Sequence, residues 1–254
     1  MEKTAAGPVT AERLPAGPAG KFASLIRLNR EERGNAIDEQ VLDGLATALA
    51  AAEADESVCV ILISGHGRDF CVGIDPVADA RLRADPLRYP EFLRRAQRVF
   101  ISLREAGKPV VGLVNGQAIG LGLEFALWCD FLYCAESARF STGSVLGGRC
   151  GGAGALTLLP RLAGLSYARE MVFTGRTIPA EEAYRHGIVN RVVADDRLIA
   201  AGMELAADTG RKFATAIAYA KNVINTGWHQ GLGVDATLSL ELERAARYAV
   251  TADG

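Results

Sequence analysis

One acidic side chain, Glu124, stands in the first turn of a predicted helix, inside the glycine-punctuated and largely apolar stretch 108–130. Gly120 and Gly122 flank Leu121 just before it, and this spacing predicts a tight turn that opens into a helix. Unpaired N–H groups at a helix start can hold an anionic oxygen, and a carboxylate beside them can move a proton. The pattern indicates a general acid/base enzyme. The alternative is a buried glutamate that only bonds to backbone, although a buried glutamate is rare without a role.

Two strand-to-loop connections must position these groups. The apolar, β-branched run 110–114 follows a proline and predicts a buried strand that leads into the glycine turn. The apolar run 58–63 predicts a second buried strand, and the loop 70–75 follows it. Because parallel strands bring their carboxyl ends to one edge of a sheet, we expect each loop to supply one backbone N–H to a common oxygen.

The remaining patterns predict an α/β fold with a parallel sheet, because strands and helices alternate. Residues 1–20 are rich in Ala, Gly and Pro and predict a flexible N-terminal arm. Residues 21–194 are expected to form the core, and residues 195–254, which show only helical patterns, a helical C-terminal region. The polar, arginine-rich segment 79–89 is expected to be mobile surface, with its arginines on solvated faces.

Composition excludes several classes of protein. A net charge of -2 over 254 residues gives no support for a nucleic-acid partner. No apolar run reaches the roughly 18 residues of a membrane span. The five cysteines form no C-x-x-C pair, which predicts reduced thiols and a cytoplasmic location. The three histidines are far apart and predict no metal site: His66, His186 and His229.

Two common motifs fail on spacing. Phe125 stands where a dinucleotide-binding G-x-G-x-x-G motif needs its third glycine. Gly143 and Ser144 resemble a nucleophile elbow, but the G-x-S-x-G spacing is absent. A Ser-His-Asp triad assembled through space stays open as a minor alternative.

From about residue 24 to residue 196 the chain resembles the crotonase (enoyl-CoA hydratase/isomerase) superfamily. The resemblance implies a crotonase-like spiral of β-β-α turns with a helical C-terminal region, assembled as a homotrimer or as a hexamer of paired trimers. It implies acyl-thioester substrates, on coenzyme A or acyl carrier protein, with no cofactor beyond the coenzyme A of the substrate. Four motifs carry it: Asn29-Arg30 with Asn35-Ala36, residues 70–75, residues 108–130, and Phe173-Thr174-Gly175 with residues 180–190.

The resemblance also implies roles for single residues. The backbone N–H groups of Ile74 and Leu121 map onto the family's oxyanion hole, and Glu124 onto the first of two catalytic glutamates. Ser144 stands at the place of the second glutamate. Arg33 and Ala36 map where the family contacts the nucleotide end of coenzyme A. The other expected substrate-binding residues are Val72, Gly73, Asp75, Gly120 and Gly143.

Departures from the family pattern leave several activities open. Ser144 can orient water, but its hydroxyl is a poor base, and Val77 replaces a common phosphate-binding lysine. Relatives often continue beyond the position of Gly254 into a final basic helix, which this sequence either lacks by nature or does not include. We expect an enoyl-CoA hydratase or isomerase with Glu124 and Ser144 as catalytic residues. A decarboxylase, a thioester hydrolase and an inactive acyl-CoA-binding protein are the alternatives.

Overall fold

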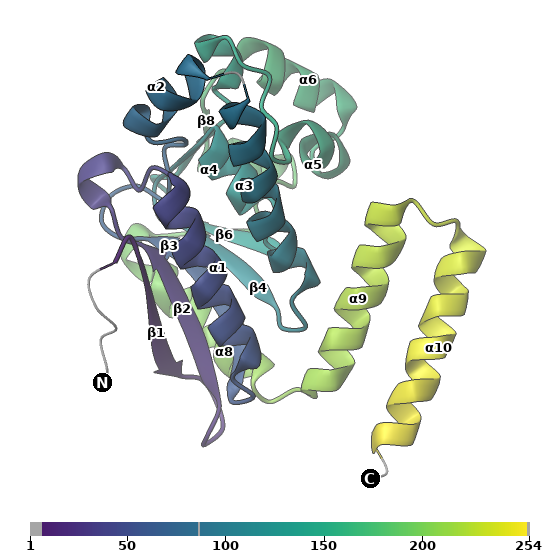
Figure 1. Cartoon of the computed structure of the whole chain (residues 1–254). Helices are drawn as coiled ribbons and strands as arrows, with labels where there is room; N and C mark the ends of the chain where they lie inside the picture. The colour runs from purple at the N-terminus through teal and green to yellow at the C-terminus, as the bar shows by residue number, and fades with distance from the viewer. Residues whose placement is uncertain (1–6, 86, 253–254) are drawn as a thin grey trace.

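A six-stranded sheet forms the centre of the computed structural model, which describes residues 7–85 and 87–252 (Figure 1). The first two strands pair antiparallel, and all the other neighbours in this sheet pair in parallel. Every residue of the central strand β4 is buried, as expected for a strand covered on both faces. In spatial order the strands are β1 (Val9–Pro15), β2 (Phe22–Leu28), β3 (Val58–Gly65), β4 (Val110–Val114), β6 (Phe131–Ala135) and β9 (Arg191–Val193).

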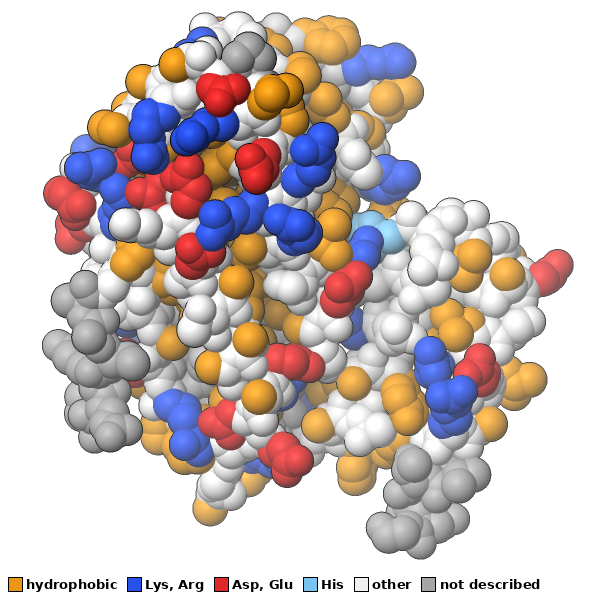
Figure 2. Space-filling model, viewed as in Figure 1, with side chains coloured by type: hydrophobic (Ala, Val, Ile, Leu, Met, Phe, Trp, Pro, Cys, Tyr) orange, Lys and Arg blue, Asp and Glu red, His pale blue; other side chains and the backbone are white. Residues whose placement is uncertain are grey.

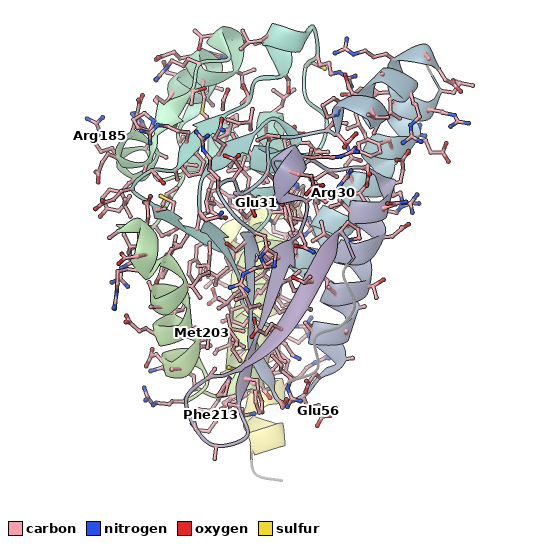
Figure 3. The ribbon with its side chains drawn as sticks, turned by 90° about the vertical axis from the view of Figure 1, so that its left-hand side faces the viewer. Arg30, Glu31, Glu56, Arg185, Met203 and Phe213 are labelled. Carbon is pink, nitrogen blue, oxygen red and sulfur yellow. The ribbon has the colours of Figure 1, made fainter. Side chains whose placement is uncertain are left out.

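Helices cover both faces of this sheet. On one face, α1 (Glu39–Ala54) and α3 (Arg88–Glu105) pack with their apolar sides inward. On the other face, α8 (Leu198–Thr209) packs against the apolar residues of β2, β3 and β4, and Figure 3 shows Met203 on this helix. Asp38 is the N-cap of α1 and accepts a hydrogen bond from the Val41 N–H at 3.0 Å.

A smaller, three-stranded sheet lies beyond the carboxyl end of β4 and carries the glycine turn. It consists of β5 (Gln117–Ile119), β7 (Arg139–Ser141) and β8 (Ile178–Pro179). The short helix α4 (Leu121–Ala126) follows β5 directly, and every residue of α4 is buried. The helices that surround this part are α2 (Pro76–Ala84), α5 (Ala155–Leu162), α6 (Leu165–Thr174) and α7 (Ala180–Arg185).

The last two helices form a hairpin at the side of the molecule (Figure 1). The helix α9 (Ala214–Gln230) lies beside the end of α3, and α10 (Val234–Ala252) packs along α9. Large apolar side chains on the hairpin are exposed to solvent: Ile224, Trp228, Leu238 and Leu242. Charged side chains of both signs instead gather over α1, α2 and α3, where ion pairs such as Arg95–Asp43 and Arg81–Glu39 link neighbouring helices (Figure 2).

Three sequence predictions are wrong in part. Residues 9–15 of the expected flexible arm form β1, because their backbone pairs along β2 from Val9 to Pro15; residues 1–6 of that arm lie outside the described residues. Most of the segment 79–89, expected to be mobile surface, is helical in α2 and at the start of α3. The helix α8 lies in the segment 195–254, which was expected to be separate from the core. It packs in the core, because its apolar side covers the second face of the sheet.

Candidate active site

The two loops that follow β3 and β4 lie against each other. The Cys71 N–H donates to the Gln117 carbonyl at 2.9 Å, and the Ile119 N–H donates to the Cys71 carbonyl at 2.9 Å. Gly73 adopts a φ of +109°, and a Cβ at this position would lie only 3.2 Å from the Ile119 carbonyl oxygen of the second loop. A glycine is therefore required both by the backbone conformation and by the close approach of the second loop.

The backbone N–H groups of Ile74 and Leu121 have no hydrogen-bond acceptor among the residues that the structure describes. Leu121 is the first residue of α4, where no carbonyl of the preceding turn is available, and Ile74 lies just before α2. Both residues line one cavity of about 210 Å³. Two free amides at one cavity wall can stabilise a developing negative charge on a bound carbonyl oxygen.

The carboxylate of Glu124 lines the same cavity and is held from behind by backbone. It accepts hydrogen bonds from the N–H groups of Gly152 at 3.1 Å, Ala153 at 3.1 Å and Ala155 at 3.2 Å. These amides lie at or just before the start of α5, where the helix dipole favours an anion. Two carboxylate oxygens offer about four acceptor positions, so one position remains for a ligand. Glu124 therefore bonds to backbone, as the alternative interpretation expected, and also lines the cavity.

Ser144 begins a 3₁₀ turn, and its Oγ lies 3.0 Å from the Thr142 carbonyl oxygen. Gly151, at a φ of +81°, separates this hydroxyl from the glutamate. A Cβ on Gly151 would lie 2.9 Å from Glu124 Oε1 and 3.9 Å from Ser144 Oγ. The hydroxyl and the carboxylate therefore both lie beside Gly151, and both residues line the cavity.

Sequence reasoning missed the charged wall of the cavity. The Arg149 guanidinium forms an ion pair with Asp79, and its Cζ lies 4.1 Å from the centre of the Tyr89 ring. Arg83 binds the other Asp79 oxygen, with its Nε 2.8 Å away. The i, i+4 spacing of Asp79 and Arg83 could have predicted their ion pair on a helix. No sequence pattern connected Arg149 to either of them.

Three predicted substrate-binding residues do not line this cavity: Arg33, Ala36 and Asp75. Asp75 instead caps α2, where it accepts a hydrogen bond from the Val77 N–H, and pairs with Arg30 at 3.0 Å and Arg33 at 2.9 Å. Burial opposes ionisation of Asp75, but the hydrogen bonds from Arg33 and the backbone outweigh it and lower the pKa of the carboxyl. The other eight predicted residues all line the cavity: Val72, Gly73, Ile74, Gly120, Leu121, Glu124, Gly143 and Ser144.

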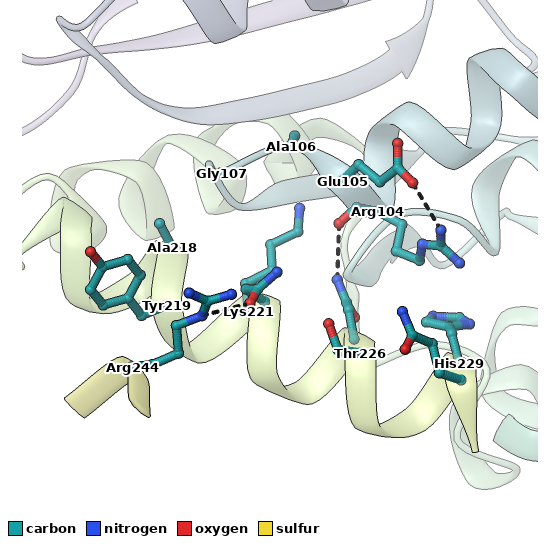
Figure 4. Close-up of a pocket in the computed structure, with 13 residues that line it drawn as sticks. Arg104, Glu105, Ala106, Gly107, Ala218, Tyr219, Lys221, Thr226, His229 and Arg244 are labelled. Carbon is teal, nitrogen blue, oxygen red and sulfur yellow. Dashed lines mark hydrogen bonds and ion pairs between the residues drawn. The ribbon is translucent and has the colours of Figure 1, made fainter. Parts of the chain in front are cut away.

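A second hollow, of about 500 Å³, lies between the end of α3 and α9 (Figure 4). In its wall, the Lys221 ammonium group donates hydrogen bonds to the carbonyl oxygens of Leu103 and Lys108. The Asn225 side-chain amide donates to the Arg104 carbonyl oxygen. These contacts dock the C-terminal hairpin on the core. Within residues 7–85 and 87–252, no three His, Cys, Asp or Glu side chains gather as a metal-binding group, and no helix is long and apolar enough to cross a membrane.

The sequence model of the enoyl-CoA hydratase/isomerase family matches residues 22–246. The chain belongs to this family. It is 32% identical over 221 residues to a crotonyl-CoA hydratase of Syntrophomonas wolfei, which covers 87% of this chain and 84% of the relative. It is 31% identical over 229 residues to a 2,3-dehydroadipyl-CoA hydratase of Escherichia coli, which covers 90% of this chain and 88% of the relative.

Solved structures of the family share the fold. The structure of an enoyl-CoA hydratase from Bacillus anthracis superposes with a TM-score of 0.88 at 27% identity, over 94% of this chain and 90% of that one. The crotonase fold and the family resemblance are therefore confirmed. The protein is an acyl-CoA-processing enzyme of the crotonase type.

Proposed function

We propose that the protein is an enoyl-CoA hydratase/isomerase that stabilises a thioester enolate in the cavity between the two loops. The observation that supports this most is the pair of free backbone N–H groups, of Ile74 and Leu121, on a wall shared with the Glu124 carboxylate. The thioester oxygen would accept from both amides as negative charge develops on it. Loss of one such donor typically costs about 2.7–4 kcal/mol of transition-state stabilisation.

Glu124 is the proposed proton carrier. Asp79, the other carboxylate at the cavity, is paired with Arg83 and Arg149 and has no comparable freedom. In isomerisation Glu124 takes the α-proton of a 3-enoyl thioester, the electron pair moves onto the thioester oxygen, and the proton returns at the γ-carbon. In hydration Glu124 takes a proton from the attacking water, and the α-carbon receives one in return. The transfer of a proton from the α-carbon to the γ-carbon needs only one carboxylate, so isomerisation suits the site at least as well as hydration.

Ser144 is the proposed positioning group for water or substrate. Its hydroxyl is neutral at physiological pH, and the residue lines the same cavity as Glu124. A hydroxyl can donate and accept a hydrogen bond but cannot hold a proton taken from carbon. Replacing Ser144 by alanine should therefore slow water addition more than α-proton exchange, which requires Glu124 alone.

The assembly, the compartment and the thioester carrier are proposals as well. The exposed apolar side chains of α9 and α10 support a homotrimer, or a hexamer of paired trimers, joined through the hairpin. Five free cysteines support a reducing location such as the cytoplasm. Coenzyme A is the proposed carrier, and acyl carrier protein the alternative.

The test is the Glu124→Gln variant, assayed with crotonyl-CoA and a 3-enoyl-CoA in deuterated water. We expect turnover and label incorporation to fall by about 10²–10⁴-fold, because the amide cannot carry the proton. Glu56→Gln is the matched control, since Glu56 is exposed near the opposite end of β3 (Figure 3). If the wild-type chain binds acyl-CoA in calorimetry but neither exchanges label nor forms product, it is an inactive binding protein, and the proposal is wrong.

A further inference from the structure

One corner of the cavity holds a cation with an unused hydrogen-bond donor. The Arg149 side chain is only 16% exposed, and its Nη2 pairs with Asp79. Its Nη1 is buried and has no hydrogen-bond partner among the described residues. Leaving a buried donor of a charged group unpaired costs free energy, so such a donor points to a partner that arrives with a ligand.

The charges at this corner favour an anion as that partner. Asp79 is shared between Arg149 and Arg83, so two guanidinium groups face one carboxylate and one positive charge is left over. The Tyr89 ring packs on one face of the Arg149 guanidinium and brings no negative charge that could neutralise it. A guanidinium donates in a planar fork that matches a carboxylate, which makes it the preferred side chain for binding one.

Ser144 and Arg149 lie on one short turn. The backbone N–H of Arg149 donates to the Ser144 carbonyl oxygen at 2.9 Å, and this bond holds the two residues on the same short turn. The Ser144 side chain carries no charge that could pair with a guanidinium. The serine hydroxyl instead lies 3.0 Å from the Thr142 carbonyl oxygen, which it can bond locally.

We infer that Arg149 binds a carboxylate on the acyl group, so that the preferred substrates are thioesters of short dicarboxylic acids. This inference rests on the proposed function, because it places the thioester oxygen at the amides of Ile74 and Leu121. The acyl chain then runs past Glu124 toward Arg149, so the thioester oxygen meets two hydrogen-bond donors and the terminal carboxylate meets a positive charge. The cavity of about 210 Å³ is of a size that suits a short acyl chain.

The test compares two 2-enoyl-CoA substrates of equal length, one ending in a carboxylate and one in a methyl group, for chains of five and six carbons. We expect the wild-type kcat/KM to favour the carboxylate-ended substrate by about 10- to 100-fold, as for a hydrogen bond to a charged group. The ratio is measured on a single preparation, so the fraction of folded protein cancels. Turnover of neither substrate would contradict the proposed function. Turnover of both without a preference would contradict only the role of Arg149.

Variants locate the preference in one side chain. Arg149→Met should reduce the ratio to about one, and Arg149→Lys should restore part of it, because lysine keeps the charge but loses the planar fork. Arg81→Met is the matched control, since Arg81 lies on the same helix as Arg83 but is exposed and pairs with Glu39. An unchanged ratio in Arg149→Met, or an equal loss in Arg81→Met, would overturn the inference.

Discussion

Replacing Lys221 by methionine removes a buried ammonium group that joins α9 to the core. Its Nζ lies 2.8 Å from Asp130 Oδ2 and donates to the Leu103 and Lys108 carbonyl oxygens, each at 2.9 Å. The side chains of Lys221 and Asp130 are only 8% and 18% exposed. Figure 4 shows Lys221 extending from α9 toward the loop around Gly107. The variant leaves the Asp130 carboxylate and two carbonyl groups without this partner.

The expected loss of stability follows from this geometry. Removing one partner of a buried ion pair typically costs about 3–5 kcal/mol, because the remaining charge stays buried and unpaired. Asp130 keeps a hydrogen bond from the Val110 N–H at 2.8 Å and retains some solvent contact, which reduces the cost. We therefore expect the free energy of unfolding to fall by about 3 kcal/mol at neutral pH.

The loss should depend on pH with a defined sign. Burial raises the pKa of Asp130 above its ordinary value, although Lys221 partly opposes this. The folded state therefore binds the proton more tightly than the unfolded state, and between the two pKa values stability declines as pH rises. Removing Lys221 raises the pKa of Asp130 further. The difference between Lys221→Met and the wild type should thus shrink as the pH falls toward the ordinary pKa of a carboxyl group.

Urea unfolding at about pH 5 and pH 8, followed by circular dichroism and tryptophan fluorescence, measures this difference. The Trp128 ring stacks on His229 of α9 with ring centres 5.9 Å apart, so its fluorescence reports the docking of the helix. The double variant Asp130→Asn, Lys221→Met completes a double-mutant cycle. It should be more stable than Lys221→Met at pH 8, because no charge is left buried.

Two results would refute this reasoning. The first is a Lys221→Met protein within about 0.5 kcal/mol of the wild type at pH 8, which would mean that the pair contributes nothing. The second is a double variant no more stable than Lys221→Met, which would mean that the loss comes from packing of the lysine side chain and not from the buried carboxylate.

Two further substitutions test how the core holds the site. In Gly122→Ala the new Cβ would overlap the Cys71 carbonyl oxygen, so the loops that carry the two free amides must separate. We expect kcat to fall by about 10²–10³-fold, as for loss of one oxyanion donor. A kcat equal to that of the wild type would show that the spacing of the two loops does not affect catalysis. Lys108→Met removes an ammonium group that binds the Ala52, Glu53 and Asp55 carbonyl oxygens at 2.6–2.9 Å at the end of α1. This variant should lower the free energy of unfolding, measured with urea, by about 1–3 kcal/mol and leave KM nearly unchanged.

Local patterns predicted the part of the site that comes from contiguous residues. The strand at Val110–Val114, the turn at Gly120 and the helix that carries Glu124 follow one another in the chain, and each has a strong local signature. The strand β1 was missed because its pairing with β2, from Val9 to Pro15, supplies hydrogen bonds that an Ala-, Gly- and Pro-rich composition does not reveal. Asp75 was expected at the substrate because it belongs to the motif 70–75 of the family resemblance. Its ion pairs with Arg30 and Arg33, more than forty positions away, have no local signature.

The sequence by itself indicated the fold family through the four motifs of the resemblance. It also determined the two glycine-rich loops and the helix start that carries Glu124, because these depend on backbone freedom and short-range periodicity. Only the tertiary structure decided what surrounds that glutamate. Backbone from the start of α5 holds its carboxylate, and Arg149 meets Asp79 across a separation of 70 residues. Long-range ion pairs leave no periodic signal in a sequence, since they depend on where folded segments cross. The acyl specificity proposed above therefore lies in contacts that exist only once the chain has folded.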